Sequence, residues 1–202
     1  LAYHMIGLLR PTNPDGKVAV AGLDVREHPL IEITKHINYA FQNPDIQLFC
    51  ETVDKELAFA LERRGMPDDE IKNRVHSVLK LFDMENLRDA YTVNLPRDQK
   101  TFLALGILLA MDPEVFIVDE PTTGLDYQGC LRMMQILRKL NDEGRTVIVI
   151  THNMELVAEY AERVIVLLNG RVLLDGSTRE VFSKPDMLRE AWIQPPQITR
   201  LA

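Results

Sequence analysis

Three acidic residues follow one apolar run in the middle of the chain. Residues 115–118 are all apolar, Asp119 and Glu120 come directly after them, and Asp126 follows a short turn. A continuous apolar run is typical of a strand buried on both faces of a parallel sheet, and ligands bind beyond the carboxyl ends of such strands. Adjacent carboxylates there suit a hydrated Mg²⁺ ion on a nucleotide, with one carboxylate near the metal and one near an attacking water.

A histidine comes after a second run of the same kind. Residues 146–150 are followed by Thr151 and His152. A helix is predicted between the two runs, and its apolar face carries Cys130, Met133, Met134, Leu137 and Leu140. Strand, helix and strand with short links form a unit with a right-handed crossover, which puts both strand ends at one edge of a parallel sheet. We therefore expect His152 to lie near Glu120 and to be functional rather than structural.

The elements that position these residues begin with strands predicted over residues 17–20 and 37–41, the second ending at a polar loop. Helices are predicted over residues 1–9 and 52–64, and a further helix begins at Asp68, which we expect to cap it. The apolar positions of that further helix recur at helical spacing, and they are Ile71, Val75, Val78, Leu79 and Phe82. Its opposite face is basic and is expected to be solvated, with Lys72, Arg74, His76 and Lys80.

Two further segments complete the architecture. Residues 102–110 are apolar all round, which predicts a buried helix, and the helices within about residues 50–110 are expected to form a subdomain inserted in an α/β core. Asn-Gly at 169–170 lies between two apolar runs and predicts an antiparallel hairpin. Two short helices, near 178–182 and 186–192, and an extended tail at Pro195-Pro196 are expected after it.

The composition limits the classes of protein to which the chain can belong. The 202 residues are 46% apolar and 26% charged, which is ordinary for one globular domain or a domain with a small subdomain. A net charge of −7 gives a nucleic-acid partner no electrostatic support. The apolar runs fall short of the roughly 18 residues that a membrane span needs, so any membrane role is expected to be peripheral. Cys50 and Cys130 stand apart and are expected to be reduced packing residues.

With these residues placed, the chain resembles the nucleotide-binding subunit of an ABC transporter. VFIVDEPTTGLD (115–126) resembles the Walker B strand and D-loop, FQNP (41–44) the Q-loop, and ITH (150–152) the H-loop or switch. The order and spacing of all three fit and cover nearly the whole chain. The resemblance implies an α/β fold over residues 1–202, with a P-loop-NTPase-like, mostly parallel sheet flanked by helices, an antiparallel β edge and an inserted helical subdomain.

Finer details resemble the ATPases of energy-coupling-factor and cobalt or nickel importers. The segments that carry this resemblance are FQNPDIQLF (41–49) with ETVDKELAFAL (51–61), LNGRVLLDGSTREVF (168–182) and the ending PPQITRLA (195–202). The resemblance implies an ATP-hydrolysing subunit that energises import of metal ions or vitamins from the cytoplasmic face of the cell membrane. Its partners would be transmembrane transporter subunits, docked near the helix at 52–64, and a second ABC ATPase in a head-to-tail homo- or heterodimer. A non-catalytic regulatory subunit and a soluble ABC protein unrelated to transport stay open as alternatives.

The resemblance also implies roles for single residues, with ATP and Mg²⁺ as the cofactors. Asp119 would hold Mg²⁺ through water, and the amide of Gln42 would reach the metal or the attacking water. Glu120 would be the general base, and His152 would contact the γ-phosphate. Asp126 would bridge to the partner subunit.

The first departure from the family concerns the Walker A loop. No Gly-x-x-x-x-Gly-Lys-Ser/Thr occurs in the sequence, and the only Gly-Lys, at 16–17, reads as a turn into a strand. That loop supplies backbone N–H groups and a lysine to the phosphates. In the family it opens the helix that leads into a segment like GLLRPT, which here stands at 7–12. We therefore expect an N-terminal truncation rather than a genuine loss.

The second departure concerns the signature, which in the family reads Leu-Ser-Gly-Gly-Gln and binds the γ-phosphate held by the opposite subunit. The matching residues here are Leu95, Pro96, Arg97, Asp98 and Gln99. Pro96 lacks both the hydroxyl and a backbone N–H, and Asp98 brings a carboxylate toward a phosphate, which Arg97 offsets only in part. We expect this signature to close a dimer site poorly, which favours a heterodimer with one competent and one weakened site.

Overall fold

The computed structural model describes residues 1–194, and the chain divides into two compact units, residues 1–150 and residues 151–202. Within residues 1–194, no helix is both long enough and apolar enough to cross a membrane. The extended tail expected at Pro195-Pro196 lies outside the described residues.

A three-stranded parallel sheet forms the centre of the first unit, in the order β3 (Ile37–Ala40), β4 (Val115–Asp119) and β5 (Thr146–Ile150). The register pairs Ile37 with Val115, and Asp119 with Ile150. Phe116, Ile117 and Val118 of β4 are at most 1% exposed, because a strand lies on each side and packed layers cover both faces. The strands predicted from continuous apolar runs are confirmed.

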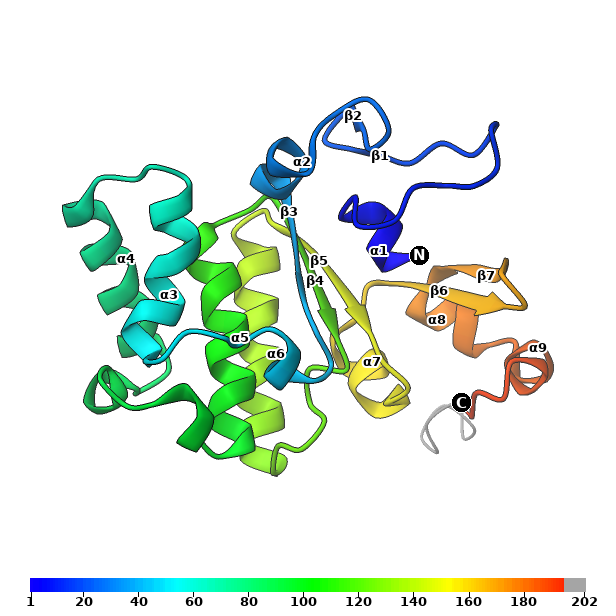
Figure 1. Cartoon of the computed structure of the whole chain (residues 1–202). Coiled ribbons are helices and arrows are strands. Elements are labelled where there is room, and N and C mark those ends of the chain that lie inside the picture. The colour runs from blue at the N-terminus through cyan, green and yellow to red at the C-terminus, as the bar shows by residue number, and fades with distance from the viewer. Residues whose placement is uncertain (195–202) are drawn as a thin grey trace. The chain divides into compact units, whose positions relative to one another are not determined.

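Two long helices cover one face of this sheet, as Figure 1 shows. They are α5 (Arg97–Met111), which packs on β3, and α6 (Tyr127–Asp142), which packs on β5. The segment predicted to be apolar all round lies in α5, where residues 102–108 and Ala110 are buried. On α6, Met133, Met134 and Leu137 are buried as core residues.

The helical segment packs outside α5 and consists of α3 (Val53–Arg63) and α4 (Asp68–Leu81). Thr52 caps α3 by accepting a hydrogen bond from the N–H of Lys55. Asp68 was expected to cap α4, but Pro67 is the N-cap and Asp68 is the first helical residue. There its carboxylate interacts favourably with the positive end of the helix dipole.

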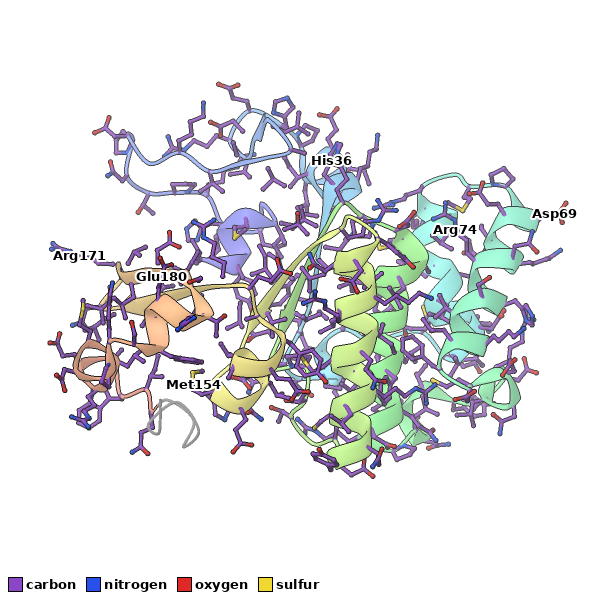
Figure 2. All side chains as sticks on the ribbon, turned by 180° about the vertical axis from the view of Figure 1, so that it is seen from behind. His36, Asp69, Arg74, Met154, Arg171 and Glu180 are labelled. Carbon is purple, nitrogen blue, oxygen red and sulfur yellow. The ribbon has the colours of Figure 1, made fainter. Side chains whose placement is uncertain are left out.

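The two faces of α4 differ as the spacing predicts. Its apolar positions 71, 75, 78 and 79, and Phe82 after it, are all buried. Lys72, His76 and Lys80 are exposed, but Arg74 is not simply solvated. The Arg74 guanidinium, labelled in Figure 2, donates to the carbonyl of Ala110 at 2.9 Å and pairs with Glu70 at 3.0 Å. It therefore joins α4 to the carboxyl end of α5.

The opposite face of the sheet is covered by the first 36 residues. The helix predicted over residues 1–9 is only α1 (Ala2–Met5), because Gly7 turns the chain at a φ of 76°. Ile6, Val20, Val25 and Ile33 pack there on β3 and on Ile117. The remaining elements are β1 (Ala19–Val20), β2 (Leu23–Asp24) and α2 (Leu30–His36), and the last two were not expected from the sequence because they are short and lack periodicity.

The second unit contains α7 (Met154–Tyr160) and an antiparallel hairpin of β6 (Arg163–Leu168) and β7 (Arg171–Ser177). The hairpin turns at Asn169 and Gly170, both with positive φ, as the Asn-Gly pair predicts. It is followed by α8 (Thr178–Phe182) and α9 (Pro185–Glu190), and three 3₁₀ turns lie in the first unit, at Pro44–Ile46, Glu85–Leu87 and Thr92–Asn94.

Candidate functional site

Asp119 is the last residue of β4, and its carboxylate is half-buried at the carboxyl end of the sheet. Its Oδ2 atom accepts a hydrogen bond from the hydroxyl of Tyr39, which lies on the neighbouring strand β3. Tyr39 is only 8% exposed, so burial and then the hydrogen bond to Asp119 raise the pKa of Tyr39 above its ordinary value. Sequence reasoning missed Tyr39, although a hydroxyl among apolar strand residues was a signal that could have found it.

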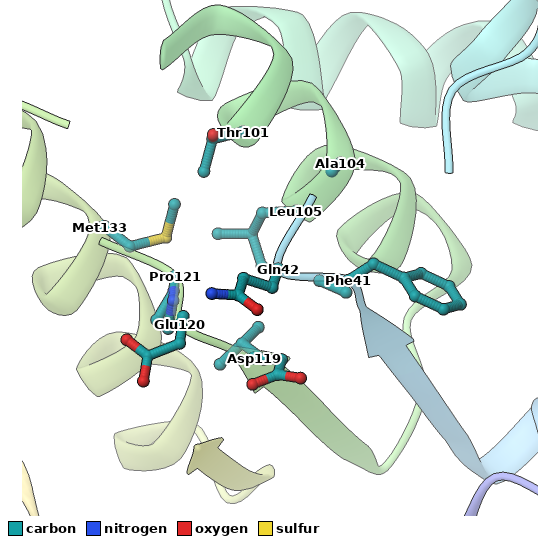
Figure 3. A pocket seen from close by; sticks show the side chains of 11 residues that line it. Phe41, Gln42, Thr101, Ala104, Leu105, Asp119, Glu120, Pro121 and Met133 are labelled. Atoms are coloured by element: carbon teal, nitrogen blue, oxygen red, sulfur yellow. The ribbon is translucent and has the colours of Figure 1, made fainter. Parts of the chain in front are cut away.

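Glu120 turns the chain directly after β4. Its φ of 47° is left-handed, a conformation that costs a non-glycine residue about 1 kcal/mol or more. The backbone is held there because the N–H of Glu120 donates to the carbonyl of Ile150 at 2.8 Å and its carbonyl accepts from Thr123 at 3.0 Å. Glu120 is thereby held at the end of the strand, where it lines the same pocket as Gln42 (Figure 3).

A small pocket lies where β3, β4, α5 and α6 meet. Its cavity volume is about 20 Å³, which is room for one water molecule. The lining residues are Ala40, Phe41, Gln42, Thr101, Ala104, Leu105, Val118, Asp119, Glu120, Pro121 and Met133. Figure 3 shows the side chain of Gln42 between Asp119 and Glu120. The structure thus brings together three of the residues that the sequence singles out.

The loop that carries Gln42 is tied to α5 by side chains. Gln47 accepts a hydrogen bond from the N–H of Phe41 at 3.3 Å and donates to the carbonyl of Ala104 at 3.1 Å. Asp45 forms an ion pair of 2.7 Å with Lys100, one turn into α5. These contacts fix the Gln42 loop against the helix that begins at the signature residues.

Asp126 is the N-cap of α6, and its Oδ1 atom accepts from the N–H of Gly129 at 2.7 Å. Gly124, two residues earlier, has a φ of 84°, and a Cβ atom built on it would lie 2.7 Å from Nε of Arg97. The side chain of Arg97 therefore lies against the turn that corresponds to the D-loop, within the same chain.

The five signature positions stand at the start of α5. Leu95 is buried, whereas Pro96, Arg97 and Asp98 are exposed and Gln99 is half-exposed. Pro96 is the N-cap, and its ring has no group that could accept a hydrogen bond from the first N–H groups of the helix. Asp98 lies in the first turn, where a carboxylate interacts favourably with the helix dipole. The pocket is lined by α5 residues that begin one turn further on, and residues 95–99 are not among them.

His152 belongs to the second unit. Ile150, which ends β5 two residues earlier, is the register partner of Asp119. The expectation that His152 lies near Glu120 follows from the sheet edge alone and stays a prediction.

The donor set at the pocket fits a hydrated magnesium ion. Within residues 1–194, no three His, Cys, Asp or Glu side chains form a group that could hold a metal ion by themselves. Mg²⁺ does not need such a group, because it keeps several waters and binds through one or two carboxylates together with substrate phosphates. Two carboxylates and one amide at a strand end are donors of that kind.

Known proteins share this sequence pattern and fold. The model of the ABC transporter family matches residues 1–123. Over its whole length, the chain is 38% identical to the energy-coupling factor transporter ATP-binding protein EcfA of Methanocaldococcus jannaschii, and it covers 72% of that protein. It is 43% identical to a Methanosarcina acetivorans protein named as an ABC transporter ATP-binding protein, and spans only 33% of that protein's length.

Solved structures agree with these relatives. CbiO1 from Clostridium perfringens, part of the ABC transporter complex CbiONQ, has a TM-score of 0.79 at 33% identity, over 99% of this chain and 80% of its own. A dimeric ATP-binding cassette bound to ADP and Pi has a TM-score of 0.77 at 26% identity, over 87% of this chain and 78% of its own. The sheet order, the acids at the end of β4 and these matches lead to one conclusion: the chain belongs to the ABC transporter family and has the fold of its ATP-binding subunits.

Proposed function

We propose that the protein hydrolyses ATP as the nucleotide-binding subunit of an importer of the energy-coupling-factor type. The observation that carries the proposal is that Gln42, Asp119 and Glu120 all line one water-sized cavity at the carboxyl end of the sheet. Acids at that position suit attack of water on a phosphate, because one can hold the metal's water while the other removes a proton.

We infer the roles of the side chains from their chemistry and from their places in the recognised motifs. Mg²⁺ bound with ATP would supply positive charge against the phosphates. Asp119 would accept a hydrogen bond from a water of that ion, and the amide of Gln42 would orient the attacking water or reach the metal. Glu120 takes the proton of the attacking water, and general base catalysis of this kind contributes about 10²- to 10⁴-fold to a rate. His152 hydrogen-bonds the γ-phosphate and stabilises its developing charge.

The substitution Glu120→Gln in the full-length protein tests the general base. We expect ATP turnover to fall by at least about 100-fold while ATP binding is retained, because the amide keeps the shape but cannot accept a proton at neutral pH. Glu143→Gln is the matched control, since Glu143 is an exposed residue at the end of α6. Unchanged turnover in Glu120→Gln would show that Glu120 is not the base.

We also propose a head-to-tail pair with a second ABC ATPase subunit, and a heterodimer in particular. Pro96 gives the partner's phosphate neither a hydroxyl nor an N–H, and Asp98 adds a like charge. The partner's signature would then complete the site at Asp119 and Glu120, whereas this chain's signature would complete the partner's site poorly. Asp126 stands near that interface in this proposal, in addition to capping α6.

The membrane partners and cargo are inferred from relatives. EcfA is named as an energy-coupling factor transporter protein, and CbiO1 as part of a transporter complex. We infer peripheral attachment at the cytoplasmic face of the membrane through transmembrane subunits, with metal ions or vitamins as cargo. Co-purification of the full-length protein with membrane subunits tests this attachment, and co-purification with ribosomes instead would contradict it.

One observation favours a second candidate function. The altered signature at 95–99 is what a non-catalytic regulatory subunit would carry. Titration of the full-length protein with ATP separates the two functions, because a regulatory subunit that had lost its site would not bind the nucleotide.

A further inference from the structure

One buried hydroxyl contacts the candidate site from outside the recognised motifs. Tyr39 lies on β3, three residues before Gln42, and its hydroxyl donates to Oδ2 of Asp119 across the two neighbouring strands. The two residues are 80 positions apart in the sequence, so the contact exists only because β3 pairs with β4. The ring and the hydroxyl of this residue have separable roles.

The ring of Tyr39 is held on two sides. It makes an edge-to-face contact with Phe41, with centroids 4.8 Å apart, and a second with Tyr3 at 5.5 Å. Aromatic pairs of this geometry are favourable beyond the area that they bury. The ring also belongs to the apolar cluster that packs around Ile33 and Ile37. A phenylalanine would satisfy all of this packing, so the packing leaves the hydroxyl unexplained.

The hydroxyl acts on the carboxylate. A buried O–H needs an acceptor, and here the acceptor is one oxygen of a candidate magnesium-site residue. With Oδ2 engaged, the carboxylate of Asp119 cannot rotate without losing a charge-assisted hydrogen bond, and Oδ1 is the oxygen left for a water of the metal ion. Partners that hydrogen-bond a metal-site carboxylate in this way orient it, and their loss typically costs 10- to 100-fold in metal affinity or activity.

We propose that Tyr39 is a positioning residue for Asp119, whose hydroxyl holds the carboxylate in the orientation that accepts a water of the nucleotide-bound Mg²⁺. The proposal rests on the proposed function, because it assigns Asp119 to that ion. It adds a residue outside the Q-loop, Walker B, D-loop and switch segments to the apparatus that holds the metal.

The test is Tyr39→Phe in the full-length protein, which removes the hydroxyl and keeps the ring. Binding of a fluorescent ATP analogue is measured across a range of Mg²⁺ concentrations and in EDTA. We expect the Mg²⁺ concentration at half-maximal enhancement of binding to rise about 10-fold, while binding in EDTA stays within about twofold of the parent. Turnover measured in parallel should return to the parent rate at saturating Mg²⁺, because general damage to the fold could not be rescued by the ion.

Tyr91→Phe is the matched control, since Tyr91 is an exposed tyrosine beside the helical segment and its ring stays in place after the change. It should leave the Mg²⁺ midpoint unchanged. An unchanged midpoint in Tyr39→Phe would overturn the proposal, as would an equal loss of binding with Mg²⁺ and in EDTA. Failure of the proposed function is seen separately: if Glu120→Gln kept full turnover while Tyr39→Phe shifted the midpoint, the general base would be wrong and the positioning role would stand.

Discussion

Lys100 and Asp45 form an ion pair of 2.7 Å that joins the first turns of α5 to the loop after β3. Gln47 makes a second connection between the same two elements, from the N–H of Phe41 to the carbonyl of Ala104. The loop that presents Gln42 to the pocket is therefore fixed on the helix that starts at the signature. We therefore expect a change in the Gln42 loop to alter the start of α5, and a change at the start of α5 to alter that loop.

Gln47→Leu should lower the free energy of unfolding by about 1–3 kcal/mol. The substitution keeps a similar volume but leaves the part-buried N–H of Phe41 without its acceptor and removes the side-chain donor to the carbonyl of Ala104, and losses of this kind cost about that much. Lys100→Met is the comparison, expected to cost about 1 kcal/mol or less because Asp45 is 60% exposed and the pair is partly solvated. Urea denaturation measures both, and a larger loss for Lys100→Met would contradict the assignment.

Gly106→Ala should destabilise the first unit although alanine favours a helix. A Cβ atom at this position in α5 would lie 2.8 Å from Cγ1 of Val78 and 3.3 Å from both Leu57 and Phe82. The gain in helix propensity of about 1 kcal/mol competes with overpacking that costs about 1–3 kcal/mol, and the stiff, branched Val78 cannot move away easily. We expect a net loss of about 1 kcal/mol by urea denaturation. Ser77→Ala on the exposed face of α4 is the control, and a stabilised Gly106→Ala would show that the helices separate freely.

Glu56 predicts a pH dependence of stability. Glu56 is 2% exposed, and its carboxylate accepts from the N–H groups of Phe49 at 2.9 Å and Cys50 at 2.6 Å. Burial raises the pKa of Glu56 above its ordinary value of 4.5, even though the two backbone donors lower it. The folded protein then binds this proton more tightly than the unfolded chain does. The contribution of Glu56 is therefore largest below pH 4.5 and is lost as the pH rises through the raised pKa.

The variant Glu56→Gln removes this titration. We expect the free energy of unfolding of the parent, minus that of Glu56→Gln, to fall as the pH rises from 4.5. Glu62→Gln, an exposed change on the same helix, provides the matched comparison. A difference that rose with pH would mean that the two N–H groups outweigh burial and that the direction of the pKa change is wrong.

Repair of the signature should raise ATP turnover in preparations that contain this subunit alone. Pro96→Ser with Asp98→Gly restores a hydroxyl and removes a carboxylate, and one such charge about 4 Å from a phosphate costs about 1 kcal/mol in water, or roughly fivefold in rate. Pro67→Ser with Asp69→Gly is the matched control, because these residues are the N-cap and second residue of α4 as Pro96 and Asp98 are of α5.

Steady-state ATPase assays of the full-length protein measure the effect. A rise of about fivefold in the signature pair alone is the expected result. Equal rates in the parent and in Pro96→Ser with Asp98→Gly would show that this signature does not limit turnover.

Much of the fold could be predicted because its signals are local. Continuous apolar runs identify β4 and β5, and the Asn-Gly pair identifies the hairpin of the second unit. The helix predicted over residues 1–9 was too long because its apolar residues are not all buried: Leu8 and Leu9 are each 50% exposed, and Gly7 ends the helix early. Asp68 was expected to cap α4 because aspartate is a good capping residue, but it lies one position inside the helix, after Pro67.

For the site, the sequence by itself determined that Asp119 and Glu120 end a buried strand, because burial and strand ends leave a pattern in consecutive residues. Only the tertiary structure decided what surrounds them. The hydrogen bond from Tyr39 to Asp119 and the bridge from Gln47 to Ala104 join residues 80 and 57 positions apart. Periodicity reports which face of an element is buried, but it does not say which distant element supplies the neighbour. Strand order and helix packing determine which distant residues become neighbours.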